Sequence, residues 1–196
     1  MPRLATIVKL KNFIVLSLLA SLAACGARGL IVDYHDPEMD FAALRTVAVM
    51  PFDNLTSNRD AAERVRTTFA NSLLATGAVY VLPLGEVARG VARAGIADPT
   101  VPSIEEIGRL AGIIKVDAVF TGVVKEYGEV RSGTAAANVI AVSMNMIEIQ
   151  TGKIVWTASA SEGGISIWDR LFGSGGKPMN DVTTAAVGDL IDGLFK

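Results

Sequence analysis

Cys25 is the only cysteine of the chain, and it ends the sequence Leu22-Ala23-Ala24-Cys25 directly after a short apolar run. A signal peptidase requires small residues before the bond that it cuts, and a basic segment (residues 3–11) precedes the apolar run as in a secretory signal peptide. The spacing therefore predicts cleavage between Ala24 and Cys25. A diacylglycerol would then join the Cys25 thiol, and a further acyl chain would join the amino group that cleavage frees.

Several acyl chains on Cys25 would hold the protein stably at a membrane, because a single chain binds only marginally. The apolar run itself is too short for a permanent spanning helix, which needs about 20 residues. The alternative is an ordinary signal peptide with an incidental cysteine. We expect residues 1–24 to be a lipoprotein signal peptide, 25–43 a lipidated tether, and 44–196 a single α/β domain. We expect no cofactor besides the acyl groups on Cys25.

The composition excludes several classes of function. The signal segment has three basic and no acidic residues, so the remaining chain is more acidic than the full chain's formal net charge of −2. A basic surface for nucleic acid is therefore not expected. Aromatic residues make up only 6% of the chain, which argues against a stacking surface for sugars or bases. A lipidated Cys25 leaves no thiol for a disulfide, so the apolar core must hold the fold.

The spacing of apolar residues predicts the order β-α-β-α-α-β-β-β-α, which is a mixed sheet of about five strands with helices packed on it. The run Val47–Met50 is apolar on both faces and indicates a strand covered on both sides. The alternation in 142–146 indicates a sheet with one less covered face. The expected strands are 47–50, 79–82, 118–127, 138–150 and 154–160, and the expected helices are 58–76, 86–94, 103–111 and 180–195.

Three further predictions are local: two concern side-chain orientation and one concerns a connecting segment. In the first long helix, Leu74 is expected to face the core and Arg66 the solvent. In the last strand, Ile154 is expected to lie on the same face as Trp156 and opposite to Val155, after a hairpin turn at 150–153. The segment 131–137 is expected to be a linker between two strands.

No catalytic or metal-binding residue is predicted. Gly173–Pro178 resembles a phosphate-binding loop, but Leu171 stands where that motif needs its first glycine and Pro178 where it needs a hydroxyl residue. Nothing in the sequence brings two of Asp53, Glu126 and Glu129 into one apolar pocket, as acid–base catalysis would require. His35 is the only histidine and has no partner motif. A hydrolase is therefore the weakest of the functional hypotheses.

The segment Ile165–Phe172 is the strongest candidate for a contact surface outside the expected strands and helices. Its apolar residues, spaced for a short helix, could dock on lipid or on a protein partner. The alternative is a short helix packed back onto the domain. The candidate contact residues are Ile167, Trp168, Leu171 and Phe172.

Segments 47–55 and 148–156, with the sequence around Cys25, resemble a superfamily of bacterial envelope lipoproteins. It includes the curli-secretion (CsgG-type) lipoproteins, the lipoprotein activators of penicillin-binding proteins, and the N-terminal domain of the Tol-system propeller protein. Residues 80–83 and 125–128 are similar to a family of small outer-membrane lipoproteins of unknown function. The resemblance covers roughly residues 44–160.

This resemblance implies a mixed α/β domain with a non-enzymatic role in envelope assembly. Gly26 after the cysteine, by similarity to other bacterial lipoproteins, favours the periplasmic face of the outer membrane. The first hypothesis is a lipid-anchored binding or adaptor protein with an envelope protein as its partner. The second is an oligomeric subunit of a curli-type secretion complex. Channel activity is not expected, because segments 131–137 and 162–180 are too short or too rich in glycine to supply two membrane hairpins.

Overall fold

The computed structural model describes residues 32–133, 135–165 and 176–195. Its elements, in chain order, are β1 (Val32–His35), η1 (Phe41–Ala43), β2 (Thr46–Val49), β3 (Asp53–Asn54), α2 (Ala61–Ala75), β4 (Tyr80–Val81), α3 (Leu84–Ala94), α4 (Ile104–Ile114), β5 (Ala118–Ser132), β6 (Ala135–Glu148), β7 (Ile154–Gly163) and α6 (Met179–Leu194).

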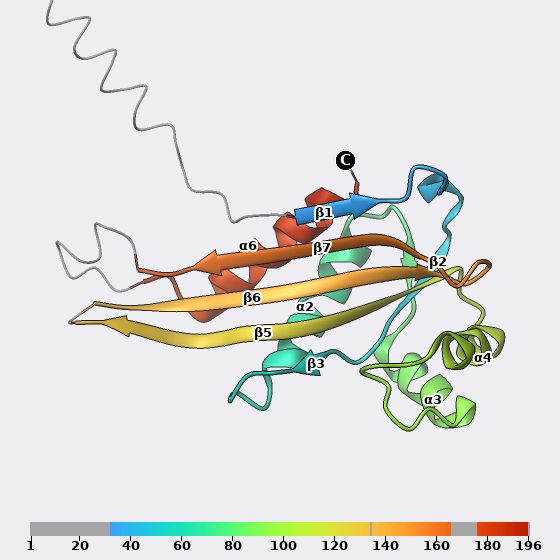
Figure 1. The fold of residues 1–196 in the computed structure, drawn as a ribbon, viewed down its shortest axis with the longest axis horizontal. Coiled ribbons are helices and arrows are strands. Elements are labelled where there is room, and N and C mark those ends of the chain that lie inside the picture. The colour runs from blue at the N-terminus through green and yellow to red at the C-terminus, as the bar shows by residue number, and fades with distance from the viewer. Residues whose placement is uncertain (1–31, 134, 166–175, 196) are drawn as a thin grey trace, which may run out of the picture.

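The strands form one mixed sheet in the order β1-β7-β6-β5-β2-β4, and the short β3 also pairs with β5 (Figure 1). Strand β2 runs parallel to β4 and β5, while β5, β6, β7 and β1 pair antiparallel. The predicted fold class is confirmed. The described residues contain seven strands rather than about five. The two additions are β1 and β3, neither of which is an apolar run. Strand β1 and η1 lie within the segment 25–43 that was expected to be a tether.

Two helical layers cover opposite faces of the sheet. Helices α2 and α6 pack on one face, where Phe69 of α2 meets Phe120 of β5 at 5.2 Å between ring centroids. Helices α3 and α4 pack on the other face, but only over the end of the sheet that holds β2 (Figure 1). Strand β2 is therefore buried on both sides, as its apolar run predicted.

Away from α3 and α4, the second face of the sheet has no helix on it in the described part of the chain. Strand β6 shows the consequence, because Val142, Met144 and Met146 are buried against α6 while Ser143 and Asn145 keep intermediate exposure. The less covered face that the alternation predicted is confirmed.

Two local motifs are present at the ends of predicted elements. Ser103 caps α4, with Glu106 bonded back to the Ser103 backbone, which is a capping box. Gly152 has φ +68° in the turn between β6 and β7, a conformation that glycine adopts without strain.

The predicted orientations of Arg66 and Leu74 are wrong. The Arg66 side chain is buried against the end of β2, and Leu74 is 49% exposed. A charged residue was assigned to solvent by its type, but its long side chain reaches a backbone carbonyl that needs a donor.

The predicted face of Ile154 is also wrong. The register between β6 and β7 shifts at Met146, so that Val155 forms a bulge. A bulge adds one residue and reverses the alternation. Val155 is therefore buried beside Trp156, and Ile154 is 48% exposed.

The expected linker 131–137 is instead the tip of a long hairpin. Strand pairing of β5 with β6 continues as far as Ser132 and Ala135. The small and charged residues of this tip belong to neither core cluster, so the apolar pattern fades although the backbone pairing does not.

Candidate interaction surface

The open face is the part of the sheet that α3 and α4 leave uncovered. Register places its residues in rows across three strands, since Val123 lies opposite Ser143 and Ser143 opposite Ser159. Seven of its residues carry no charge, have small side chains, and are neither buried nor fully exposed: Thr121, Val123, Ala141, Ser143, Asn145, Thr157 and Ser159. Glu126, which lies opposite Ala141, adds an exposed carboxylate at the margin of this group.

Hydroxyl groups on the open face bond to their neighbours across the strands. Ser143 and Ser159 share a hydrogen bond of 2.6 Å between their hydroxyl oxygens, and the Thr157 hydroxyl donates to the Met144 carbonyl oxygen at 3.1 Å. Covering these three hydroxyl groups would cost little, because they already have hydrogen-bond partners.

The β5 edge is the second exposed feature, defined here as Glu126–Ser132. Strand β3 pairs with β5 only at Val123 and Val124, and the Leu55 N–H donates to the Val124 carbonyl oxygen at 3.0 Å. Beyond that point no described strand lies along the outer side of β5. The β5 edge therefore presents backbone groups to which another strand could bond.

A groove of about 530 Å³ lies on the helical side of the β5 edge. Tyr127 of the edge, the first turns of α2 and the start of α6 form its walls. The lining residues are Asn58, Glu63, Arg64, Thr67, Thr68, Tyr127, Met179, Asn180 and Thr183. Its mixed lining offers hydrogen-bonding groups rather than a deep apolar site.

An acidic pocket of about 380 Å³ lies between η1 and the β6–β7 turn. The carboxylates of Asp36, Asp40 and Asp117 in this pocket accept hydrogen bonds from backbone N–H groups. Asp117 accepts from the N–H groups of Arg45 and Thr46, each at 2.8 Å, and Asp40 accepts from the Ala42 N–H at 3.0 Å. Among the described residues, no group of three His, Cys, Asp or Glu could hold a metal ion.

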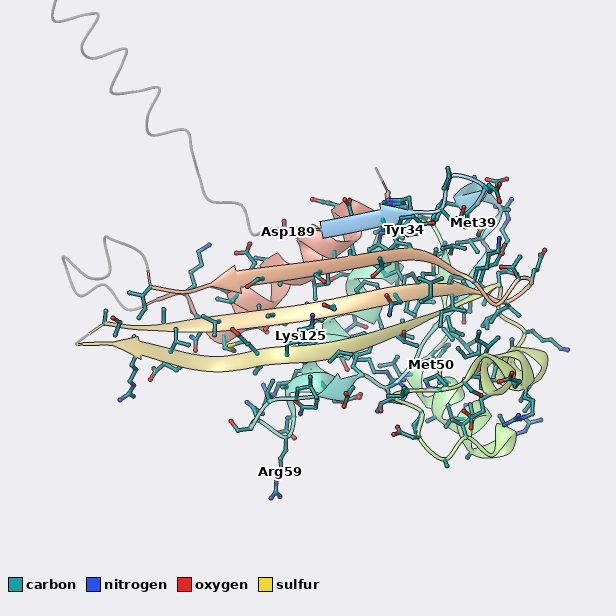
Figure 2. All side chains as sticks on the ribbon, viewed as in Figure 1. Tyr34, Met39, Met50, Arg59, Lys125 and Asp189 are labelled. Carbon is teal, nitrogen blue, oxygen red and sulfur yellow. The ribbon has the colours of Figure 1, made fainter. Side chains whose placement is uncertain are left out.

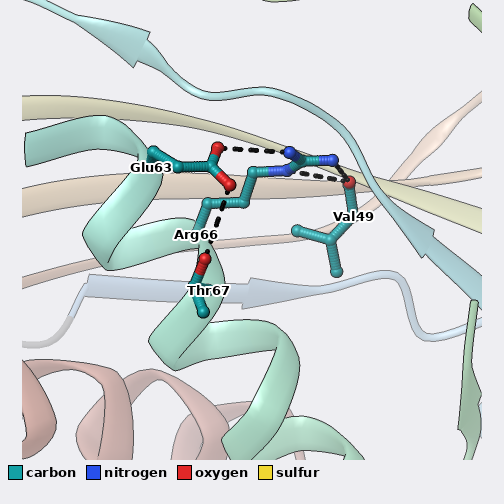
Figure 3. Close-up of polar contacts among 4 residues, drawn as sticks. All are labelled: Val49, Glu63, Arg66 and Thr67. Carbon is teal, nitrogen blue, oxygen red and sulfur yellow. Dashed lines mark hydrogen bonds and ion pairs between the residues drawn. The ribbon is translucent and has the colours of Figure 1, made fainter. Parts of the chain in front are cut away.

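Arg66 is the most buried charged residue of the described chain (Figure 3). It donates from Nε and Nη2 to the Val49 carbonyl oxygen at 3.2 and 2.8 Å. It also pairs with the Glu63 carboxylate at 3.2 Å, and that carboxylate is largely exposed. This contact ties α2 to the end of β2, so we assign Arg66 a structural role.

The predicted site residues Ala24, Cys25, Ile167, Trp168, Leu171 and Phe172 lie outside the described residues. His35 packs edge-on against Phe41, with its Nε2 3.4 Å from the Leu194 carbonyl oxygen. Of the carboxylates, Asp53 accepts from the Asn54 N–H and Glu129 pairs with Arg131. Neither pocket above is lined by Asp53, Glu126 or Glu129.

Sequence reasoning missed the β5 edge. The charged residues Glu126, Glu129 and Arg131 were available as a signal, because charges on every second or third position are typical of an unpaired strand. None of the helices that the structure describes is long and apolar enough to cross a membrane.

Comparison with solved structures shows a shared fold. The dodecameric PelC from Paraburkholderia phytofirmans superposes with a TM-score of 0.57 at 20% identity, over 84% of this chain and 98% of that one. The lipoprotein GNA1162 from Neisseria meningitidis superposes with a TM-score of 0.54 at 19% identity, over 76% of this chain and 98% of that one.

A search of curated proteins found no match. A family model described as "Putative lipoprotein GNA1162-like" matches residues 32–187. This range includes every strand and most of α6. The chain therefore belongs to the GNA1162-like lipoprotein family.

Proposed function

We propose that this lipoprotein is a binding or adaptor protein of the bacterial envelope, held at the membrane by acyl chains on Cys25 and acting through protein contacts rather than catalysis. The open face carries this proposal. No described helix covers it, and its central residues Thr121, Ser143 and Asn145 carry no charge, as protein interfaces likewise exclude charges from their centre. Membership of a lipoprotein family supports the anchor.

A charge placed on the open face should abolish partner capture. Asn145→Arg would bring a guanidinium into the middle of the face, while Asn71→Arg places the same group on the exposed side of α2 as a matched control. We expect crosslinking in intact cells, read by mass spectrometry, to lose its partner peptides only for Asn145→Arg. Equal capture by both variants, with equal melting temperatures, would contradict the proposal.

The anchor is tested separately. We propose that the protein lies on the periplasmic face of the outer membrane, because Gly26 follows the acylated cysteine. Cys25→Ala should no longer incorporate a fatty-acid analogue and should leave the membrane fraction. Label retained by this variant would rule out Cys25 as the acylation site.

The apolar segment residues Ile167, Trp168, Leu171 and Phe172 are a further proposed contact with lipid or partner. Replacing Trp168 and Phe172 by Ser should weaken membrane or partner contact without lowering the melting temperature. A large loss of stability would assign these side chains to the core instead.

A second candidate function is that of an oligomeric subunit, as in a curli-type secretion complex. The likeness to a dodecameric protein, over nearly all of that protein's length, favours it. The mass of the detergent-purified, full-length protein tests this candidate, and a strictly monomeric protein would contradict it.

A further inference from the structure

The β5 edge is the part of β5 that continues past its last contact with β3. Its side chains from Glu129 to Ser132 are all exposed, including the apolar Val130 at 39%. Figure 1 shows the hairpin tip extending past β3, and no described strand lies along the outer side of this edge. An exposed strand edge is a template for pairing with another chain, so its side chains decide which strand it accepts.

The backbone groups that point outward from the edge can be assigned from the register. The Asn138 carbonyl oxygen accepts from the residue directly after β7, so Asn138 points away from β5. Because successive residues of a strand alternate, Ala137 points toward β5 and bonds to Val130, which lies opposite it. Glu129 and Arg131, on either side of Val130, therefore point their N–H and carbonyl groups outward.

A bulge in β5 sets the faces of these side chains. The register shifts by one residue at Lys125 (labelled in Figure 2), and beyond it the even-numbered residues lie opposite the open-face residues of β6. Val130 therefore points to the side of the open face, whereas Glu129 and Arg131 point to the side of α2 and α6. There, Glu129 and Arg131 form an exposed ion pair within the chain.

We propose that the β5 edges of two copies pair antiparallel about a twofold axis at Val130. Val130 then lies opposite its counterpart, and Glu129 lies opposite Arg131 of the other copy. Glu129 and Arg131 exchange both backbone hydrogen bonds across the contact, because their groups point outward. The two Val130 residues form a non-hydrogen-bonded pair, in which side chains lie closest together. The proposal rests on the oligomeric form of the proposed function and supplies one of its contacts.

The charges at this contact alternate in sign. In each copy Glu129 and Arg131 already pair with each other, and across the contact each faces the opposite charge of the other copy. The ion pair within each copy is therefore kept while a second pair forms across the strands, and opposite charges directly opposite are favourable. One register thus joins an apolar pair on one side of the sheet to opposite-charge pairs on the other.

The other twofold registers of the β5 edge are less favourable. An axis at Glu129 or at Arg131 sets two like charges directly opposite each other. An axis at Gly128 brings the end of the other strand opposite Val124, whose carbonyl oxygen already accepts from the residue after β3. An axis at Ser132 leaves only the two hairpin tips in contact, because β5 ends there.

Strands β4 and β1 match the edge less well than a second β5 edge does. Strand β4 has two described residues and would cover only part of the edge. In β1, Asp33 is the only acidic residue, and it already has an interaction within its own chain. It is therefore not free to pair with Arg131.

The paired edges form a closed dimer, because the same surface of both copies is used. The helices of both copies lie on one side of the extended sheet, so the two open faces lie on the other side and stay available to a partner. A twofold axis along the membrane normal places both Cys25 anchors on the same leaflet.

A single cysteine tests the register in the full-length, acylated protein in its own membrane. Val130→Cys sets two thiols directly opposite each other, with Cβ atoms about 4.5–5.5 Å apart, close enough for a disulfide after small movements. We expect a disulfide-linked dimer under mild oxidation and no larger species. The wild-type protein, whose only cysteine is acylated, should form none.

Two neighbouring positions supply matched controls. Gly128→Cys and Ser132→Cys each place the thiols of the two copies about 14 Å apart along the strands, so each variant alone should form at least several-fold less dimer. Gly128 of one copy lies directly opposite Ser132 of the other, so the two variants should crosslink to each other when they are co-expressed with different tags. A Cβ at Gly128 meets no atom within 4 Å, so this substitution fits the fold.

Charge reversal tests the side chains that set the register. In the Val130→Cys protein, Glu129→Arg sets two arginines opposite each other and should lower the dimer yield several-fold. Adding Arg131→Glu restores an opposite-charge pair and should restore the yield. A yield that ignores both changes would overturn the role of the charges.

The outcomes separate this inference from the function beneath it. A wild-type protein that is monomeric by mass overturns both. A wild-type oligomer whose Val130→Cys variant forms no dimer overturns the strand pairing and leaves the oligomer standing. Equal self-crosslinking by Val130→Cys and Gly128→Cys would contradict the register. A Val130→Cys disulfide to a different protein would show that another partner occupies the β5 edge and would also overturn the inference.

Discussion

The two halves of β5 have opposite surroundings although they form one strand. The first half, Ala118–Val124, lies between β6 on one side and β2 and β3 on the other, and most of its side chains are buried. The second half, the β5 edge, pairs with β6 alone and is largely exposed. The residues change accordingly, from an apolar and β-branched run to one rich in charges.

The comparison shows that backbone pairing and core formation can separate along a single strand. The first half is fixed by packing, whereas the second is held by the hairpin ladder and keeps its outer edge available. The first half therefore sets stability, and the second is free to be used in contacts. Substitutions matched between the halves can test this division.

The largest effect should come from Phe120→Ala in the first half. Phe120 packs edge-on against Phe69 and Trp156, with ring centroids at 5.2 and 6.1 Å. Truncating a buried aromatic residue costs about 3–5 kcal/mol of unfolding free energy. Val130→Ala in the second half should cost less than about 0.5 kcal/mol. Denaturant unfolding measures both, and similar losses would refute the division between the halves.

Arg66→Met should have the next largest effect. It removes both donors to the Val49 carbonyl oxygen. Val49 is the last residue of β2, which pairs with the first half of β5. A buried acceptor left without a partner costs about 1–3 kcal/mol. Arg64→Met, on the exposed side of the same helix, is the control and should stay within about 0.5 kcal/mol of wild type. A stable Arg66→Met variant would mean that water replaces the guanidinium.

A pair of glycines on β5 sharpens the comparison further. A Cβ added to Gly122 would lie 2.9 Å from the Phe52 ring, while one added to Gly128 would meet no atom within 4 Å. Gly122→Ala should therefore destabilise the protein by about 1–3 kcal/mol through overpacking. Gly128→Ala should be neutral or slightly stabilising. The melting temperatures of the two variants test this difference. An unchanged melting temperature for Gly122→Ala would show that the Phe52 ring can move.

The smallest effect concerns a loop outside both halves. Hydrogen bonds from the Thr100 hydroxyl and N–H hold the pKa of the exposed Asp98 below its ordinary value. A depressed pKa in the folded state adds stability above the unfolded pKa, and that stability is lost as pH falls through the folded pKa. Thr100→Val should raise the Asp98 pKa in an NMR titration without a measurable change in melting temperature near neutral pH. An unchanged pKa would show that the Thr100 hydroxyl is not the main cause of the lowered Asp98 pKa.

The order of the long elements could be read from the sequence, because each buries a periodic apolar set. Val47–Met50 and the alternation in β6 indicated the covered and open faces before any coordinates. Strand β3 could not be found in this way, since it has no apolar run and gains its pairing from β5 rather than from its own pattern.

The errors came from tertiary context. Arg66 was placed by charge, although a carbonyl at the end of a distant strand supplies its partner. The bulge at Val155 reversed a face that strict alternation had assigned to Ile154. The extent of the open face depends on where α3 and α4 pack against the sheet, and this has no local signal in β5, β6 or β7.

The place where β1 begins limits how far the domain can stand from its anchor. Val32 lies beside Ser159 in the sheet, and seven residue steps separate it from Cys25. A fully extended chain of that length reaches at most about 25 Å. With Cys25 acylated, the β1 side of the domain would stay within roughly its own width of the lipid headgroups, so that a partner embedded in the same leaflet would come within reach while one across the periplasm would have to extend toward it.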